Sequence, residues 1–206
     1  MDKSKHLSAH PSDLVSRFHR SRSLSTPAHS GRDRSSPSMR PTSAIPPAYY
    51  TVFAIYEPVL TTLGFLGAVL DPKGTHDYQA PWPNGPPPED LPLATRLTII
   101  QLGHVCALLG LLNVWLLTAA RVHLSFQPAL QEKIVGALLT PLLIGDVAHL
   151  WISLWALGDQ RWNIQNWSPM LFITFTLGFT LFVPRVMWQL GIGRYVDSRD
   201  RPSPKS

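Results

Sequence analysis

The chain has 206 residues, of which 45% are hydrophobic and 15% charged, and its formal net charge is +5 at pH 7. Residues 1–43 hold eight Lys and Arg against three acids, so the excess charge lies in a Ser- and Pro-rich tail. Nucleic-acid binding needs basic residues on a folded face, which this distribution does not offer, and the single cysteine, Cys106, excludes an intrachain disulfide and a cysteine-based zinc site.

The first 43 residues contain too few large apolar side chains to offset the entropy of ordering, which predicts a disordered basic tail. Its charge favours contact with anionic lipid headgroups or a role in setting membrane topology.

Four apolar stretches follow the tail, each close to the ~20 residues that a helix needs to cross a bilayer. They cover about 49–70, 95–118, 134–157 and 169–190. The fold class predicted is therefore all-α: a polytopic membrane protein whose four-helix transmembrane bundle lies in a domain over 44–195. A short disordered tail is expected over 196–206.

The connections predict the topology. Residues 71–92 contain seven prolines and four acids, which favours a stiff extended loop and not another helix. Lys and Arg are more frequent on the side of both chain ends, which predicts cytoplasmic N- and C-termini. We expect the endoplasmic reticulum membrane. The Arg- and Ser-rich start leaves a mitochondrial membrane as the alternative, which the three acids of the tail weaken.

Polar side chains inside the spans are predicted to form two layers, if depth is counted at ~1.5 Å per helical residue. The layer nearer the chain ends holds Glu57, Asn113 and Arg185. The layer nearer the opposite face holds Asp146, His149, His104 and Gln101. Intramembrane ionisable groups are costly, so they indicate a functional site or a buried polar network.

Asp146 and His149 lie three residues apart and share a helix face, where a carboxylate can orient an imidazole and move protons. The candidate catalytic residues are Glu57, Asp146, His149 and His104, and the candidate ligand-binding residues are Gln101, Asn113, Trp155 and Arg185. Equally, Arg185 and Glu57 could form an ion pair that fixes helix packing. Neither a metal nor a cofactor is predicted, because the close-spaced histidine motifs of membrane oxygenases are missing from the sequence.

Proline and glycine positions predict the helix geometry. Pro58 and Pro141 lack the amide that an α-helix needs, so both are expected to kink their helices and to favour a central cavity. Small residues at Gly103, Ala107 and Gly110, and at Gly64 and Gly67, are expected to allow close helix packing.

Three segments carry a resemblance to a family of small fungal membrane proteins. They are IPPAYYTVFAIYEPVLTTLGFLGA (45–68), GDVAHLWISLWALG (145–158) and FVPRVMWQLGIGR (182–194). That family has a domain of unknown function with four spans, so the resemblance implies architecture and no activity. A looser, fold-level likeness is to the EXPERA superfamily of sterol isomerases and sigma-receptor-like proteins. It implies a pocket for a sterol or amine, around which Glu57, His104, Asp146 and Trp155 would lie.

Two hypotheses for function follow. In the first, the polar intramembrane site binds or isomerises a sterol-like or terpenoid lipid, with Glu57 or Asp146 as the acid and a histidine as the base. In the second, the protein is a non-catalytic membrane assembly or scaffold protein whose buried polar groups fix helix packing. Proton-coupled transport is a third, and it would need an oligomer. The lipid bilayer is the expected partner, and the sequence leaves enzymatic status and oligomeric state open.

Overall fold

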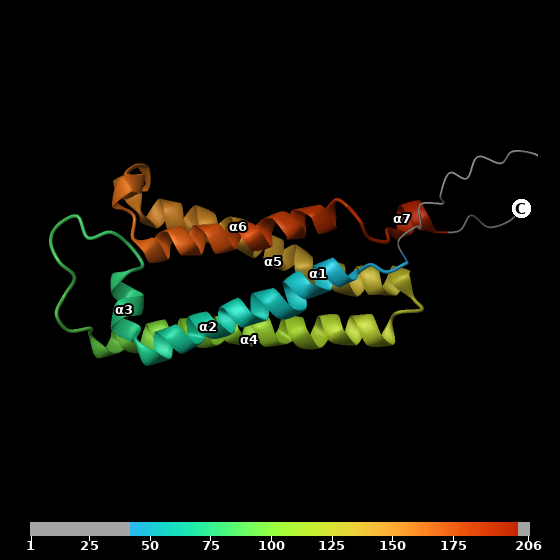
Figure 1. The fold of residues 1–206 in the computed structure, drawn as a ribbon, viewed down its shortest axis with the longest axis horizontal. Coiled ribbons are helices and arrows are strands. Elements are labelled where there is room, and N and C mark those ends of the chain that lie inside the picture. The colour runs from blue at the N-terminus through green and yellow to red at the C-terminus, as the bar shows by residue number, and fades with distance from the viewer. Residues whose placement is uncertain (1–41, 202–206) are drawn as a thin grey trace, which may run out of the picture. The chain divides into compact units, whose positions relative to one another are not determined.

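Four helices of the chain are long and apolar enough to cross a membrane: Pro47–Leu70, Leu93–His123, Pro128–Ala156 and Pro169–Gln189. The computed structural model describes residues 42–201, so residues 1–41 of the tail predicted over 1–43 lie outside them. The last residue of that predicted tail, Ser43, is hydrogen-bonded to Gln131 and to the Tyr195 amide. The described residues contain helices and no strand, which confirms the all-α polytopic fold (Figure 1). In chain order the elements are α1 (Pro47–Thr51), η1 (Val52–Tyr56), α2 (Glu57–Leu70), α3 (Pro72–Asp77), α4 (Leu93–His123), α5 (Pro128–Ala156), η2 (Gly158–Trp162), η3 (Ile164–Asn166), α6 (Pro169–Gln189) and α7 (Asp197–Asp200).

The long helices pack as two pairs, α2 with α4 and α5 with α6 (Figure 1). We call the two ends of this bundle the α3 end and the α7 end. At the α7 end all four spans contribute to one apolar core, made of Ile45, Tyr49, Phe53, Ala54, Leu117, Ala120, Val135, Leu139 and Trp188. The two helix pairs are therefore held together mainly at the α7 end.

Small residues explain the close contact of α2 with α4. A Cβ atom on Gly110 would lie 2.3 Å from Thr61 Oγ1 and 3.1 Å from Pro58 Cα, and one on Gly103 would lie 3.1 Å from Ala68 Cβ. The packing role predicted for these two glycines is confirmed. It is wrong for Gly64 and Gly67, because a Cβ atom on either would meet nothing within 4 Å.

The segment before the first span is held by side chains from later helices. Ala44 is fully buried, its amide donates to Gln131 Oε1 at 2.8 Å, and its carbonyl accepts from Trp188 Nε1 at 2.8 Å. Gln131 Nε2 also donates to the Ala120 carbonyl at 3.0 Å. Three spans and the entering chain thus meet at two buried polar side chains.

Two predictions for the segments outside the spans differ from the structure. The segment predicted as an extended loop begins with the short helix α3, because Asp71 Oδ1 caps it by accepting from the Gly74 amide at 2.8 Å and Pro72 suits its first turn. The segment predicted as the second tail contains α7, whose Asp197 amide donates to Glu132 Oε2 at 2.7 Å. The start of this predicted tail is therefore bonded to the bundle, while Arg199 and Arg201 remain exposed.

Candidate functional site

A group of three charged side chains, two of them buried and the third partly buried, joins three of the four spans. Arg185, in α6, is 1% exposed, and its Nη2 donates to Glu57 Oε1 at 2.5 Å. Its Nη1 donates to Asp146 Oδ2, in α5. We call Glu57, Asp146 and Arg185 the charge cluster. One guanidinium faces two carboxylates in it, so the cluster carries a surplus negative charge if both acids are ionised.

Prolines interrupt the backbone hydrogen bonding of two helices beside the charge cluster. Directly before Glu57 the chain forms the π-helical turn η1, in which the Glu57 amide bonds to the Val52 carbonyl five residues earlier. A kink was predicted from Pro58, and the missing amide is accommodated here by this wider turn. In α6, Pro184 comes directly before Arg185 and removes the bond to the Thr180 carbonyl. The side-chain oxygens of Tyr56 and Thr180 lie 3.1 Å apart, so η1 also contacts α6 one turn before Pro184.

Three polar atoms of this region have no hydrogen-bond partner among the described residues 42–201: Glu57 Oε2, Arg185 Nε and Asn113 Nδ2. Asn113 is 1% exposed and adjoins the Glu57 carboxylate. Arg185 also lies over the Phe53 ring, 5.7 Å from its centroid. The predicted layer of Glu57, Asn113 and Arg185 is therefore present, and Asp146 joins it.

The position of Asp146 corrects the sequence-based layers. Counting depth along helix axes separated it from Arg185 and grouped it with His104. Side chains, however, lean toward the N-terminus of their own helix. Because α5 and α6 run in opposite directions, Asp146 leans toward the α7 end and Arg185 toward the α3 end. The two charged groups meet between their Cα levels.

The remaining candidate residues form no hydrogen bond with the charge cluster, although His149 lies near Asp146. His149 interacts electrostatically with Asp146 but is exposed, and His104 packs its ring 5.9 Å from the Phe65 ring. Gln101 is exposed, and Trp155 is 70% exposed. No three His, Cys, Asp or Glu side chains within the described part of the chain lie close enough to hold a metal. The layer expected around Asp146, His149 and His104 does not form.

A groove of about 330 Å³ lies along the contact of α2 with α4, at the α3 end. Its lining is mostly apolar or small and comprises Thr61, Gly64, Phe65, Ala68, Thr75, Gln79, Ile99, Leu102, Gly103 and Cys106. We call this the α2–α4 groove. Thr61 follows Glu57 by one helical turn, so one end of the groove approaches the charge cluster along α2, and Thr75 and Gln79 place polar groups at the other end. Sequence reasoning missed this groove, although two of the small residues that it singled out, Gly64 and Gly103, line it.

A second hollow, of about 520 Å³, lies between α3 with its following loop and the start of α6. Ser168 Oγ, which caps α6, bonds to the Tyr78 carbonyl and joins these elements. Asp77 lies beside His76 and Lys73, at 2.9 Å and 2.5 Å. The hydrogen bond from His76, followed by that from Lys73, holds the pKa of Asp77 below its ordinary value. This hollow is open and lined by residues already paired with one another, so we assign it no ligand.

Comparison with known proteins yields one match, to a family model. Residues 42–195 match the model described as "Domain of unknown function (DUF7704)". No curated protein and no solved structure matches the chain. The matched segment covers all four spans, the π-helical turn η1 and the charge cluster. The chain is thus a multi-pass membrane protein that belongs to the DUF7704 family.

Proposed function

We propose that this protein binds a sterol-like or terpenoid lipid in the α2–α4 groove, without chemical conversion of it. The observation that carries the proposal is the groove itself: a hollow of about 330 Å³ with apolar walls and polar residues near both ends. Small-molecule sites commonly measure ~300–1,000 Å³ and combine an apolar lining with a few polar groups. Such a lining suits a lipid with a rigid apolar body and a small polar group.

The isomerase form of the hypothesis has less support. A general acid must reach the reacting atom, directly or through one water. Both candidate acids, Glu57 and Asp146, are bonded to Arg185, and His104 and His149 lie outside the charge cluster. These contacts favour a structural role for the acids.

Filling the groove is expected to weaken lipid binding while leaving the fold intact. Gly64 lines the groove and a side chain there would meet open space, so Gly64→Leu should weaken binding of dehydroergosterol by about tenfold or more. Gly67→Leu is the matched control, because Gly67 lies on the same helix with equal space around it but outside the groove. Binding is measured by sterol fluorescence with the protein in mild detergent, and farnesol is tested as a competitor.

Cys106 reports where the probe binds, because it is the only cysteine of the chain and lines the groove. A bound sterol should slow the modification of its thiol by methyl methanethiosulfonate. Equal binding by wild type and both glycine variants, or an unchanged rate at Cys106, would contradict the groove as the site.

The charge cluster favours a second candidate function, a membrane scaffold without a ligand. Its ion pairs join α2, α5 and α6, and buried polar groups can specify one helix arrangement. Under this reading neither glycine variant would change the co-purifying lipids.

We also propose that the α7 end faces the cytoplasm, in the endoplasmic reticulum membrane. Arg121, Lys133, Arg194, Arg199 and Arg201 lie at the α7 end, against Lys73, Arg96 and Arg161 at the α3 end. Such an excess favours the cytoplasmic side. An epitope at the C-terminus should be accessible to antibody after selective permeabilisation of the plasma membrane. One introduced in the 71–92 loop should be accessible only after full permeabilisation, and the reverse pattern would contradict this orientation.

A further inference from the structure

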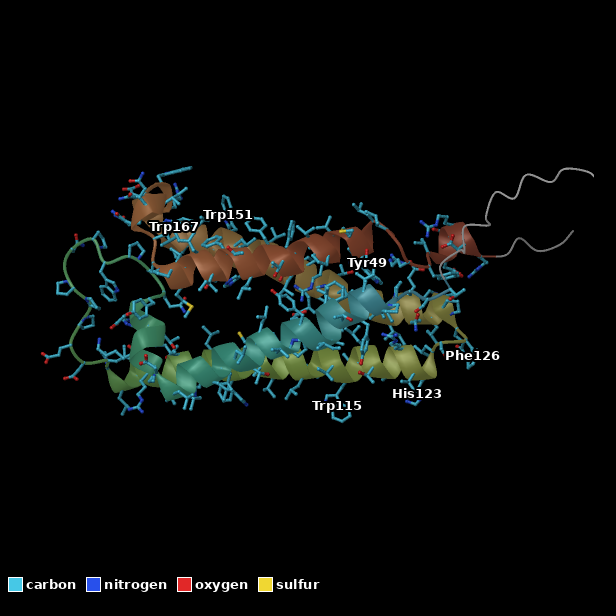
Figure 2. The ribbon with its side chains drawn as sticks, in the orientation of Figure 1. Tyr49, Trp115, His123, Phe126, Trp151 and Trp167 are labelled. Atoms are coloured by element: carbon cyan, nitrogen blue, oxygen red, sulfur yellow. The ribbon has the colours of Figure 1, made fainter. Side chains whose placement is uncertain are left out.

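Tryptophan side chains gather where α5 ends. Trp151, Trp155 and Trp162 are 71%, 70% and 77% exposed, and Figure 2 shows Trp151 projecting outward from the helix. With Leu154 and Arg161 they line a hollow of about 270 Å³. The hollow is separate from the α2–α4 groove, since the two share no lining residue.

Arg161 is the cationic group of this hollow. Among the described residues it forms no ion pair, whereas Arg185, Arg194, Arg199 and Arg201 all pair with carboxylates. Its guanidinium carbon lies 5.2 Å from the centroid of the Trp162 ring, and its Nε is buried without a hydrogen-bond partner within residues 42–201. The Arg161 guanidinium thus lies against the indole ring of Trp162 and still has N–H donors free to bond to a ligand.

The backbone fixes where this arginine lies relative to the bilayer. The span of α5 ends at Ala156, and Arg161 belongs to the 3₁₀ turn η2 that follows. Trp167 Nε1, near the start of α6, donates to the Gln160 carbonyl at 3.1 Å and holds this turn. Arg161 therefore lies just beyond the apolar span, at the level of the lipid headgroups.

From this arrangement we infer that Arg161 and the three tryptophans form a binding site for the phosphate of a glycerophospholipid. Arginine binds phosphate through a planar fork of donors, and such charge-assisted bonds are stronger than neutral ones. Indole rings suit the boundary between acyl chains and headgroups, where they contact the glycerol and the first methylene groups. Phosphate is the anion that the bilayer presents at this depth. The site does not depend on the α2–α4 groove or on its ligand.

The test compares two lipids that differ only in the headgroup. Full-length protein in mild detergent is titrated with dioleoyl phosphatidylglycerol and with dioleoylglycerol, and bound lipid is counted by native mass spectrometry. We expect wild type to prefer the phospholipid by roughly tenfold. Arg161→Gln should remove this preference. Arg96→Gln is the matched control, because Arg96 is an exposed arginine at the same end of the bundle and does not line the hollow.

Two further variants keep the result interpretable. Arg161→Lys retains the charge without the planar fork and should show an intermediate preference, which tests the site if the glutamine variant fails to fold. Gly64→Leu should retain the full preference, which separates this site from the groove. Equal binding of both lipids by wild type, or equal losses in the Arg96 and Arg161 variants, would overturn the inference. So would a lipid-independent dimer in which the tryptophans are buried by a second copy.

Discussion

Replacing Arg185 by methionine is expected to destabilise the protein by about 3–5 kcal/mol, the cost of removing one partner from a buried ion pair. Arg185 is 1% exposed and bonds to both Glu57 and Asp146, so its loss leaves two carboxylates without a cation. The Asn113 amide adjoins Glu57 but carries no charge to replace the guanidinium. The expected readout is a lower thermal transition in detergent, followed by size-exclusion chromatography with fluorescence detection.

A triple variant separates loss of charge balance from loss of a catalytic or ligand group. Glu57→Gln, Asp146→Asn and Arg185→Met together remove every charge of the cluster, and most of the stability should return. Arg201→Met is the surface control: its arginine is 68% exposed and pairs with Asp197, so the change should cost less than about 1 kcal/mol. If the single Arg185 variant is as stable as this control, the cluster does not hold the helices together.

The sequence was sufficient for the spans, because length and apolar composition alone decide whether a helix can cross a bilayer. The helices α4 and α5 nevertheless run beyond the expected limits, since Arg121 and Lys133 end the apolar stretch without ending the helix. A residue with a charged side chain can lie outside the hydrocarbon layer while its backbone continues the hydrogen bonds of the helix. Hydropathy therefore predicts where the chain enters and leaves the hydrocarbon layer, and not where the helix begins and ends.

The charge cluster could be predicted in part. Depth along the helices paired Arg185 with Glu57, and the structure has this ion pair. Asp146 was missed as a partner because axial counting ignores the direction in which side chains lean. The signal that would have helped is Pro184, which directly precedes Arg185 as Pro58 directly follows Glu57. A proline next to a charged residue in two spans frees a backbone carbonyl near each charge, which indicates that both charges face the polar interior of the bundle.

The α2–α4 groove and the Trp-lined hollow depend on helix rotation, which a single sequence does not fix. Glycines at Gly64 and Gly103 look alike in the sequence, yet one meets open space and the other contacts Ala68. Similarly, Trp162 and Trp188 both lie near the end of a span in the sequence, yet Trp162 is 77% exposed whereas Trp188 is 2% exposed and belongs to the core. Position near a span end predicts an aromatic residue's depth in the bilayer. It does not predict whether the ring faces lipid or protein.

Trp188→Ala is accordingly expected to have the other large effect on stability, about 3–5 kcal/mol for a large aromatic side chain removed from a core. The substitution would leave a cavity against Gly136 and remove the ring over which Arg194 lies at 4.0 Å. It would also deprive the buried Ala44 carbonyl of the Trp188 Nε1 donor. Since Ala44 holds the entering chain to α5 and α6, the first span should lose its anchor at the α7 end.

Two controls divide this effect into packing and hydrogen bonding. Trp188→Phe keeps an aromatic ring in the core but removes the Nε1 donor and the smaller ring of the indole, so it should cost less than the alanine variant, about 1–3 kcal/mol. Trp115→Ala removes a tryptophan that is 73% exposed and points away from the bundle, and should change stability by less than about 0.5 kcal/mol (Figure 2). Thermal transitions of the three variants should therefore rank with Trp188→Ala lowest and Trp115→Ala close to wild type. Equal transitions for both alanine variants would mean that the ring of Trp188 is not part of the core and that the helix pairs are joined mainly by the charge cluster.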